Sequence, residues 1–295
     1  MAQAIRKDVG DNFSKIMKLS IIIVSWQVKD LLENCLRSIY AKLVDLNFEV
    51  IVVDNNSTDG TVEMVRSNFP QTKILASRNN LGFARANNLG LKNSSGDFVL
   101  FLNPDTEFFD SSLTRAINFI AHDKKIGILG ARLLNADLTL QPSVRRFPAL
   151  FDHLIMMFKL HHLFLLKRYL ALDFNYDKTQ NVEQVMGALF LVSRQCLNKI
   201  GFWDEKYYLW FEEVDFCQRA IGAGFKVVYF AQTEIIHYGG RSFNQEKFNL
   251  KKQWIFSLSR LNYIKKHQSV LAYWLIFLLT PISLFLSIMP VKNDR

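Results

Sequence analysis

The chain has 295 residues, 49% of them hydrophobic and 21% charged, and its 36 Lys and Arg exceed its 27 Asp and Glu by nine. This length and composition exclude a disordered or collagen-like chain and allow one large domain or two small ones. The three cysteines are odd in number and form no CxxC pair, which excludes a disulfide scaffold and favours a reducing, cytoplasmic compartment.

The first hundred residues alternate strand-like and helix-like segments. Residues 1–18 form a polar tail that lacks the apolar stretch of a signal peptide, so we expect the folded part to stay in the cytoplasm. From apolar runs and helical spacing, strands are predicted at 19–25, 48–53, 73–76 and 97–102, and helices at 29–43, 58–68 and 83–91. This alternation predicts an α/β fold with a mainly parallel sheet, flanked by helices, whose strand ends form one ligand-binding crevice.

The second half is less regular. Residues 150–172 are strongly apolar with interspersed basic side chains, and predict a basic amphipathic helix or pair of helices, packed in the core or lying at a membrane interface. Further strands are predicted at 185–192 and 226–230, and further helices at 212–223 and 245–266. Because no repeat or low-complexity linker occurs, we expect one compact domain with a membrane appendage.

A basic segment leads into an apolar one at the end of the chain. Residues 241–269 hold seven Lys and Arg against one Glu, and residues 270–291 hold no charge. A helix of 22 residues, rising about 1.5 Å per residue, is long enough for a hydrocarbon core of about 30 Å, whereas Pro281 favours a buried or broken helix. The basic flank favours an anionic membrane surface over nucleic acid and places the folded part on the cytoplasmic side. We therefore predict a membrane-associated segment over residues 244–295.

Several catalytic motifs are absent from the sequence. It contains no Walker A, dinucleotide-binding, HExxH or GxSxG motif, which argues against those phosphoryl-transfer, redox and hydrolytic sites. Polar residues instead follow two predicted strands. Asp54 can accept hydrogen bonds from a base or ribose, or belong to a turn and helix cap. Asn103 and Asp105 face the same way and either bind a divalent cation that holds a diphosphate or form an ordinary turn.

Three carboxylates lie within four residues at the start of the helix predicted over 212–223. Glu212, Glu213 and Asp215 are either first-turn acids that favour the helix dipole or parts of a catalytic site. The aromatic residues before them suit either an acceptor pocket or the core.

Together these segments resemble a known family. SIIIVSW, VDNNSTDGT, NNLGFARANNLGL and GDFVLFLNPDT occur in that order, followed by QPSVRRFP, GFWDEKYYLWFEEVDFCQR and IIHYGG. They resemble the inverting family 2 glycosyltransferases with the GT-A fold, and within them the rhamnosyltransferase-like branch. The motifs span residues 19–243, which we expect to form the glycosyltransferase domain.

The resemblance implies a binding site for a nucleotide sugar. Asp54 matches the residue that recognises the base, and Arg85 matches one at the nucleotide and diphosphate. The full set of donor-binding residues implied in this way is Ser25, Asp54, Asn56, Arg85, Asn103 and Asp105.

The resemblance also implies a metal site. Asp105 matches the last acid of the DxD motif and His237 matches the histidine that completes coordination of Mg²⁺ or Mn²⁺. Asn103 replaces the first acid of the motif, so that it contacts the sugar or a water instead.

The acidic segment carries the catalytic role in the family. Glu213 matches the general base, with Glu in place of the commoner Asp, and Glu212 or Asp215 could share that role. Residues on the acceptor side are by the same match Trp203, Asp204, Trp210 and Glu212.

The implied activity is inverting transfer of a sugar to a hydroxyl of a glycan or polyprenyl-linked acceptor in cell-surface polysaccharide synthesis, at the cytoplasmic face of the cell membrane. The branch implies dTDP-L-rhamnose as donor, with UDP-sugars as the alternative. A membrane-bound nucleotide-sugar-binding or scaffold protein with a degenerate site is the rival hypothesis. A nucleotidyltransferase is disfavoured because no Gly-rich loop follows the first strand.

Overall fold

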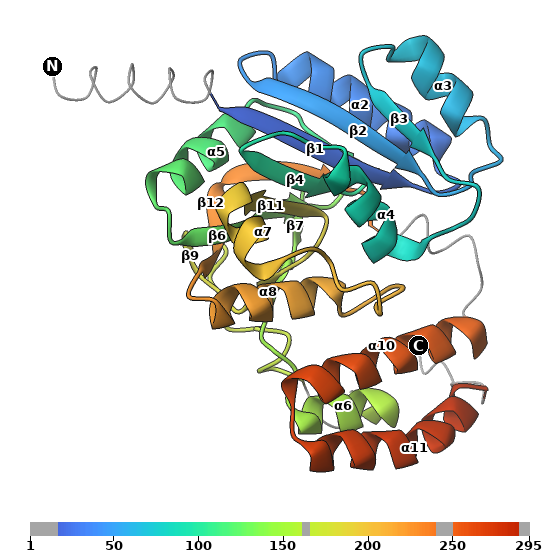
Figure 1. Ribbon diagram of the computed structural model, residues 1–295. Coiled ribbons are helices and arrows are strands. Elements are labelled where there is room, and N and C mark those ends of the chain that lie inside the picture. The colour runs from blue at the N-terminus through green and yellow to red at the C-terminus, as the bar shows by residue number, and fades with distance from the viewer. Residues whose placement is uncertain (1–16, 161–165, 240–249, 289–295) are drawn as a thin grey trace, which may run out of the picture.

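An α/β domain and a unit of three helices make up the computed structural model, which describes residues 17–160, 166–239 and 250–288 (Figure 1). The first half of the α/β domain contains these elements: β1 (Lys18–Ser25), α2 (Lys29–Lys42), β2 (Asn47–Asp54), α3 (Thr61–Asn68), β3 (Lys73–Ala76), α4 (Gly82–Lys92), β4 (Phe98–Leu102) and β5 (Thr106–Glu107). The second half contains these: α5 (Leu113–His122), β6 (Ile126–Leu134), β7 (Leu140–Gln141), β8 (Val144–Arg145), β9 (Gln180–Asn181), β10 (Gln184–Val185), β11 (Leu189–Ser193), α7 (Arg194–Ile200), α8 (Glu212–Gly222) and β12 (Lys226–His237).

The main sheet has the strand order β3-β2-β1-β4-β11-β6-β12-β5 within the described residues. β1 pairs in parallel with β2 and β4, and β2 with β3, as predicted. β11 runs antiparallel to β4 and to β6, whereas β12 is parallel to β6. The sheet is therefore mixed, and the predicted parallel arrangement holds for its first four strands.

Helices cover both faces of this sheet. One face packs against α2, α3 and α5 through their buried apolar side chains, and the other packs against α4, α7 and α8. All five residues of β4 are buried, which explains its uninterrupted apolar sequence. The crossover helices thus place the carboxyl ends of β1, β2 and β4 at one edge (Figure 1).

Several predicted boundaries need correction. Of the helix expected over residues 150–172, the described part contains α6 (Leu150–Met157), which ends before Lys159 with its positive φ of 54°, and residues 167–172 form turns. Residues 161–165 of this prediction lie outside the described residues. α3 begins three residues later than predicted, after Gly60 with its φ of 83°. The strand expected over 185–192 is divided into β10 and β11, and β12 continues to His237. α5 and β6 are core elements that the sequence analysis does not predict.

The helical unit consists of α6, α10 (Leu250–His267) and α11 (Val270–Ile288). Apolar residues of α10 and α11 form one cluster with Tyr207, Phe211 and Val214, which lie around the start of α8. The described part of the C-terminal segment thus packs on the α/β domain. Within the described residues, no helix has the length and apolar character that crossing a membrane requires, so the predicted apolar stretch is not shown to be a span. The start predicted for the preceding helix, residue 245, and residues 289–291 lie outside the described residues.

Candidate active site

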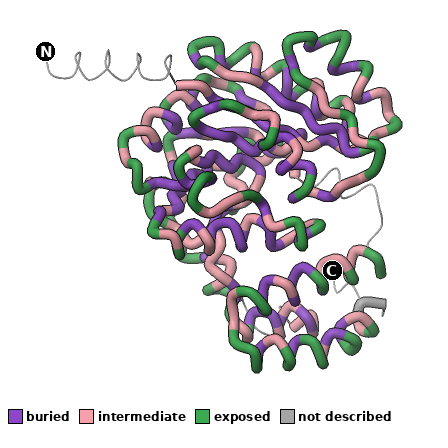
Figure 2. Tube along the Cα trace, viewed as in Figure 1, coloured by how far each residue is buried: buried purple, intermediate pink, exposed green. Residues whose placement is uncertain are grey.

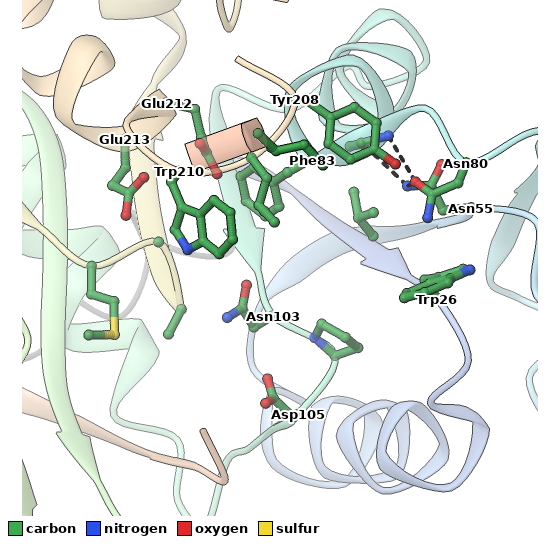
Figure 3. A pocket seen from close by; sticks show the side chains of 18 of the residues that line it. Trp26, Asn55, Asn80, Phe83, Asn103, Asp105, Tyr208, Trp210, Glu212 and Glu213 are labelled. Atoms are coloured by element: carbon green, nitrogen blue, oxygen red, sulfur yellow. Dashed lines mark hydrogen bonds between the residues drawn. The ribbon is translucent and has the colours of Figure 1, made fainter. Parts of the chain in front are cut away.

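A cleft of about 560 Å³ lies at the carboxyl ends of β1, β2 and β4 (Figure 3). The loop before α8 and the first turns of α8 and α10 form its other walls. Its lining residues include Val24, Trp26, Asn55, Asn80, Phe83, Asn103, Asp105, Met186, Tyr208, Trp210, Glu212, Glu213, His237, Lys251, Lys252 and Ile255. The cleft thus brings together residues that are more than 200 positions apart in the sequence.

Two strained residues precede the catalytic helix. Trp210 and Phe211 have φ values of 66° and 68°, a left-handed conformation that costs non-glycine residues energy. Phe211 is buried in the cluster with α10, and the Asp215 amide donates to its carbonyl at 2.9 Å. This packing holds the turn and directs Glu212 and Glu213 to the cleft (Figure 3).

The two glutamates share a poorly solvated environment. Burial, together with the neighbouring charge of Glu213, raises the pKa of Glu212 well above its ordinary value. Burial also raises the pKa of Glu213. Glu212 Oε2 is buried without a hydrogen-bond partner in the part of the chain that the structure describes. A carboxylate with a raised pKa is a stronger base than an ordinary one, so this pair is suited to accept a proton.

Asp215 has a different role from its two neighbours. Its Oδ1 lies 2.7 Å from His267 Nε2 and 2.8 Å from Lys266 Nζ, and its Oδ2 accepts from Arg219 Nε at 2.8 Å. Burial alone would raise the pKa of this carboxyl, but its hydrogen bonds and charged partners lower it to about 2. Asp215 therefore connects α8 to the end of α10, and it does not line the cleft.

Asp105 and His237 meet across a short strand pairing. Thr106 of β5 pairs with His237 of β12, and the Tyr238 amide donates to the Asp105 carbonyl at 2.9 Å. This places Asp105 Oδ1 3.4 Å from His237 Nε2. Asn103 Nδ2 lies 3.3 Å from the same nitrogen, so that Asn103, Asp105 and His237 form one polar cluster.

Gln141 fixes the orientation of the histidine. His237 Nδ1 lies 2.6 Å from Gln141 Oε1, a carbonyl that only accepts, so Nδ1 carries the proton. In the neutral imidazole Nε2 then carries a lone pair beside Asn103 Nδ2 and Asp105 Oδ1, the arrangement of a metal-binding histidine with an outer hydrogen-bond partner. One carboxylate and one imidazole nitrogen fit a divalent cation whose other ligands come from a diphosphate and water. No set of three or more His, Cys, Asp or Glu side chains suited to a metal occurs among the described residues.

The opposite end of the cleft is organised by asparagines. Asn55 Nδ2 donates to Asn80 Oδ1 at 3.0 Å and to the Gly82 carbonyl at 3.2 Å, as Figure 3 shows for the two side chains. Gly82 has a φ of 76°, and a Cβ at this position would come within 2.6 Å of the Tyr208 carbonyl oxygen. Glycine therefore lets the loop before α4 lie directly against the loop that leads to the glutamates.

The predicted donor-binding residues do not all line the cleft. Asn103 and Asp105 do, whereas Ser25 and Asp54 are buried at the paired ends of β1 and β2, next to lining residues. Ser25 Oγ and Asp54 Oδ1 lack hydrogen-bond partners in the described structure. Asn56 is exposed, with a φ of 69°. Arg85 is mostly exposed and pairs with Glu205 at 3.5 Å instead of reaching the cleft.

Two predicted acceptor-side residues also lie elsewhere. Trp203 is only 2% exposed, and its indole packs against Phe101, Phe190 and Phe216. Trp203 is therefore a core residue in this structure, and it does not line the cleft. Asp204 does not line the cleft either, because its carboxylate is bound by Lys266 at 2.8 Å.

The remaining acceptor-side predictions, Trp210 and Glu212, do line the cleft, as does Glu213. Sequence reasoning missed Trp26 and Asn55, which directly follow Ser25 and Asp54, and the lysines at the start of α10. Trp26 and Asn55 could have been predicted, because each directly follows the end of a predicted strand. The signal for Lys251 and Lys252 is tertiary, since only the packing of α10 brings them to the cleft.

Comparison with known proteins agrees with this geometry. Residues 20–190, more than half of the chain, match the family model described as Glycosyl transferase family 2. The chain belongs to this family. The resemblance read from the motifs is thereby confirmed.

Curated relatives share its sequence at low identity. The glycosyltransferase is 26% identical over 242 residues to N-acetylglucosaminyl-diphospho-decaprenol L-rhamnosyltransferase of Mycobacterium tuberculosis, which covers 76% of this chain and 77% of the relative. It is also 26% identical to the O-antigen biosynthesis protein RfbC of Myxococcus xanthus over 81% of this chain, which is only 18% of that protein.

Solved structures share the fold of the glycosyltransferase. The mannosyltransferase PcManGT of Pyrobaculum calidifontis, in complex with GDP-Man and Mn²⁺, superposes with a TM-score of 0.57 at 17% identity, covering 91% of this chain and 72% of that one. TarS 1–349 of S. aureus, in complex with UDP, gives 0.55 at 18% identity, covering 88% and 69%. The predicted GT-A type of α/β fold is thus confirmed.

Proposed function

We propose that the glycosyltransferase is an inverting, metal-dependent hexosyltransferase that moves L-rhamnose from dTDP-L-rhamnose to a hydroxyl of a polyprenyl-linked glycan in cell-surface polysaccharide synthesis. A UDP-sugar is the alternative donor. The observation that carries this proposal is the convergence of Glu212, Glu213, Asp105 and His237 on one cleft. The mycobacterial relative, named for rhamnosyl transfer to a diphospho-decaprenol acceptor, supports the choice of sugar and acceptor.

The base of the reaction is Glu213. It lines the cleft on α8, and burial raises its pKa above the ordinary value, which makes its carboxylate a stronger base. As the acceptor oxygen attacks the anomeric carbon, the hydroxyl proton passes to the Glu213 carboxylate. The charge of Glu213 helps to raise the pKa of Glu212, so the pair resists carrying two negative charges at once.

Asp105 and His237 would hold Mg²⁺ or Mn²⁺ opposite the base. When bound, such a cation offsets the charge that develops on the departing diphosphate. Gln141 holds His237 with its Nε2 beside Asp105 Oδ1 and Asn103 Nδ2, and the Oδ1 of Asn103 would contact the sugar or a water. These roles need no further acidic ligand from the protein.

The proposed base, Glu213, and the proposed metal ligand, Asp105, lie on different walls of the cleft. Figure 3 shows Glu213 on the wall formed by α8 and Asp105 on the loop that follows β4. A base on one side of the anomeric carbon and a leaving-group site on the other favour a single displacement, which inverts the configuration. The nucleoside would lie at the end of the cleft lined by Trp26 and Asn55. The buried oxygens of Ser25 and Asp54, which lack partners among the described residues, directly precede these two residues and support this assignment.

We further propose that the enzyme works at the cytoplasmic face of the cell membrane. The net charge of +9, with its excess over residues 241–269, is suited to an anionic lipid surface. A polyprenyl-linked acceptor would be reached from that surface.

A donor panel tests the proposed function. The purified chain is incubated with Mn²⁺, a GlcNAc-diphosphate-polyprenyl acceptor and, in turn, dTDP-L-rhamnose, UDP-GlcNAc, UDP-galactose and GDP-mannose. We expect glycosylated product with dTDP-L-rhamnose at a rate at least tenfold above the other donors, and none after chelation. Faster transfer from a UDP-sugar would assign that sugar as the donor in place of dTDP-L-rhamnose. The absence of transfer from every donor would support a binding protein with a degenerate site.

A further inference from the structure

The exposed large hydrophobic side chains are concentrated on one helix. Of the 19 such residues among the described part of the chain, eight lie on α11, and Figure 2 shows exposed stretches along this helix. Leu271 and Leu278 are 83% and 68% exposed. The eight residues, here called the outer face of α11, are Val270, Leu271, Trp274, Leu275, Phe277, Leu278, Ile282 and Phe285. Monomeric soluble proteins rarely expose a contiguous apolar patch of this kind without a partner for it.

The buried face of α11 has the opposite composition. Its buried side chains are Ala272, Ile276, Thr280 and Ser283, of which three are small or polar, and the partly buried Tyr273 and Leu279 pack beside them. The hydroxyls are satisfied locally, since Thr280 Oγ1 donates to the Ile276 carbonyl at 2.7 Å and Ser283 Oγ donates to the Met157 carbonyl at 3.1 Å. A helix surrounded by water places its large apolar residues inward. This helix places eight of them outward, as expected where the surrounding medium is itself apolar.

Positive charge lies at the two ends of α11 and is absent between them. The helix itself carries no charged residue. Lys265 Nζ lies 5.9 Å from the centroid of the Tyr273 ring near its start, and Lys159 Nζ donates to the Leu286 carbonyl at 3.3 Å near its end. Lysines that flank an apolar surface reach anionic headgroups while their stems stay on that surface. Trp274 is an aromatic residue of the kind enriched at membrane interfaces.

α10 connects this face to the active site. Its first turns supply Lys251, Lys252 and Ile255 to the cleft, and the same helix packs along α11 (Figure 1). A substrate with its sugar in the cleft and its lipid in a bilayer would need this adjacency.

We propose that the outer face of α11 inserts into the headgroup boundary of an anionic bilayer, with the helix lying in the plane of the membrane. The role of this membrane binding rests on the proposed function, in which the acceptor is linked to a lipid. The binding of α11 to a bilayer does not depend on that function. A lipid surface fits better than a second copy of the chain, because the charge-free centre between two lysines complements acyl chains bordered by anionic headgroups.

Vesicle flotation tests the proposal. The full chain is mixed with vesicles of phosphatidylglycerol and phosphatidylcholine and compared with the double variant Leu271→Glu/Leu278→Glu. The matched control is Val44→Glu/Leu138→Glu, which places two charges at exposed apolar positions far from α11. We expect the intact chain and the control to float, to remain bound in 0.5 M salt, and to bind at least tenfold more than the α11 variant.

Two further measurements distinguish loss of membrane binding from loss of enzyme activity and test whether α11 itself contacts the lipid. Transfer to a water-soluble alkyl glycoside acceptor should be equal in the intact chain and the α11 variant, so that loss of binding is distinct from loss of activity. Brominated lipids should quench the fluorescence of the intact chain more than that of Trp274→Phe. Equal flotation of the α11 variant would overturn the proposal. So would an intact dimer that does not bind vesicles and becomes a monomer in the variant, since a second copy would then cover this face.

Discussion

α8 and α11 depart from ordinary helix composition in opposite directions. α8 places acidic side chains in poorly solvated positions, with Glu212 only 5% exposed, whereas α11 places leucines, phenylalanines and a tryptophan on the surface. Each arrangement costs free energy in a chain that is surrounded by water alone. Acidic side chains that are buried and large apolar side chains that are exposed therefore indicate surfaces where another molecule binds. On α8 that molecule is the acceptor with its proton, and on α11 it is a lipid surface.

The two helices are held by different means. α8 is fixed by the strained turn at Trp210 and Phe211 and by the ion pairs of Asp215. α11 is fixed by close packing of small side chains such as Ala272 and Ser283. Substitutions can therefore remove the chemistry of one helix without affecting the surface of the other.

The largest effect is expected for Glu213→Gln. The amide cannot accept a proton, so kcat should fall by about 10²–10⁴-fold, the usual contribution of a general base. Binding of the nucleotide, measured by calorimetry with dTDP, should be unchanged. The matched control is Glu63→Gln, an exposed glutamate of α3, which should leave kcat unaltered. Near-normal turnover in Glu213→Gln would assign the base to Glu212.

Loss of the Asp215 carboxylate should have the next largest effect, on stability. Its folded-state pKa of about 2 lies below the ordinary value of 3.8, and such a shift corresponds to roughly 2–3 kcal/mol at neutral pH. Asp215→Asn should lower the free energy of unfolding by that amount in urea titrations at pH 7. Because the carboxylate stabilises the fold only while it is ionised, the difference should shrink as the pH falls from about 4 toward 2. A constant difference over this range would exclude the ion pairs as its cause.

Gln141→Ala tests the orientation of His237. Without its hydrogen-bond acceptor the imidazole can turn or change tautomer, and the affinity for Mn²⁺ should fall by about 10–100-fold. The affinity is measured from the Mn²⁺ dependence of activity and directly by electron paramagnetic resonance. Gln71→Ala, at an exposed glutamine between α3 and β3, serves as control. Unchanged Mn²⁺ affinity in Gln141→Ala would show that the metal does not depend on His237.

The smallest effect is expected for Glu212→Gln. Burial and the charge of Glu213 raise the pKa of Glu212, so ionisation of this side chain opposes folding at any pH above its ordinary pKa of 4.5. Removing the charge should raise the free energy of unfolding by about 1 kcal/mol at pH 8, and the gain should vanish as the pH falls toward 4.5, where the carboxyl is protonated in the unfolded chain as well. A loss of stability at pH 8 would contradict the assigned environment.

The sequence predicts the parts of the molecule that depend on local pattern. Uninterrupted apolar runs predict β1, β2 and β4, because strands buried on both faces need such runs. Family motifs then place Asp105, Glu213 and His237 in one cleft, which the structure bears out in position.

The rest depends on contacts between distant residues. Glu212, Glu213 and Asp215 are alike in type and close in sequence. Asp215 is committed to ion pairs by Arg219 on its own helix and by Lys266 and His267, some fifty residues later. Trp203 has the composition of a binding residue, and its packing partners from three other elements make it a core residue. For the segment 270–291, the composition indicates contact with an apolar environment. It does not indicate which face of the helix makes that contact.

The configuration of the product tests the central claim most directly, that Glu213 assists a single displacement. The coupling constants of the anomeric carbon and proton are measured by NMR on product made from a donor of known configuration. The account predicts an anomeric configuration opposite to that of the donor in the intact enzyme, with the same product formed far more slowly by Glu213→Gln. Retention of configuration would contradict it.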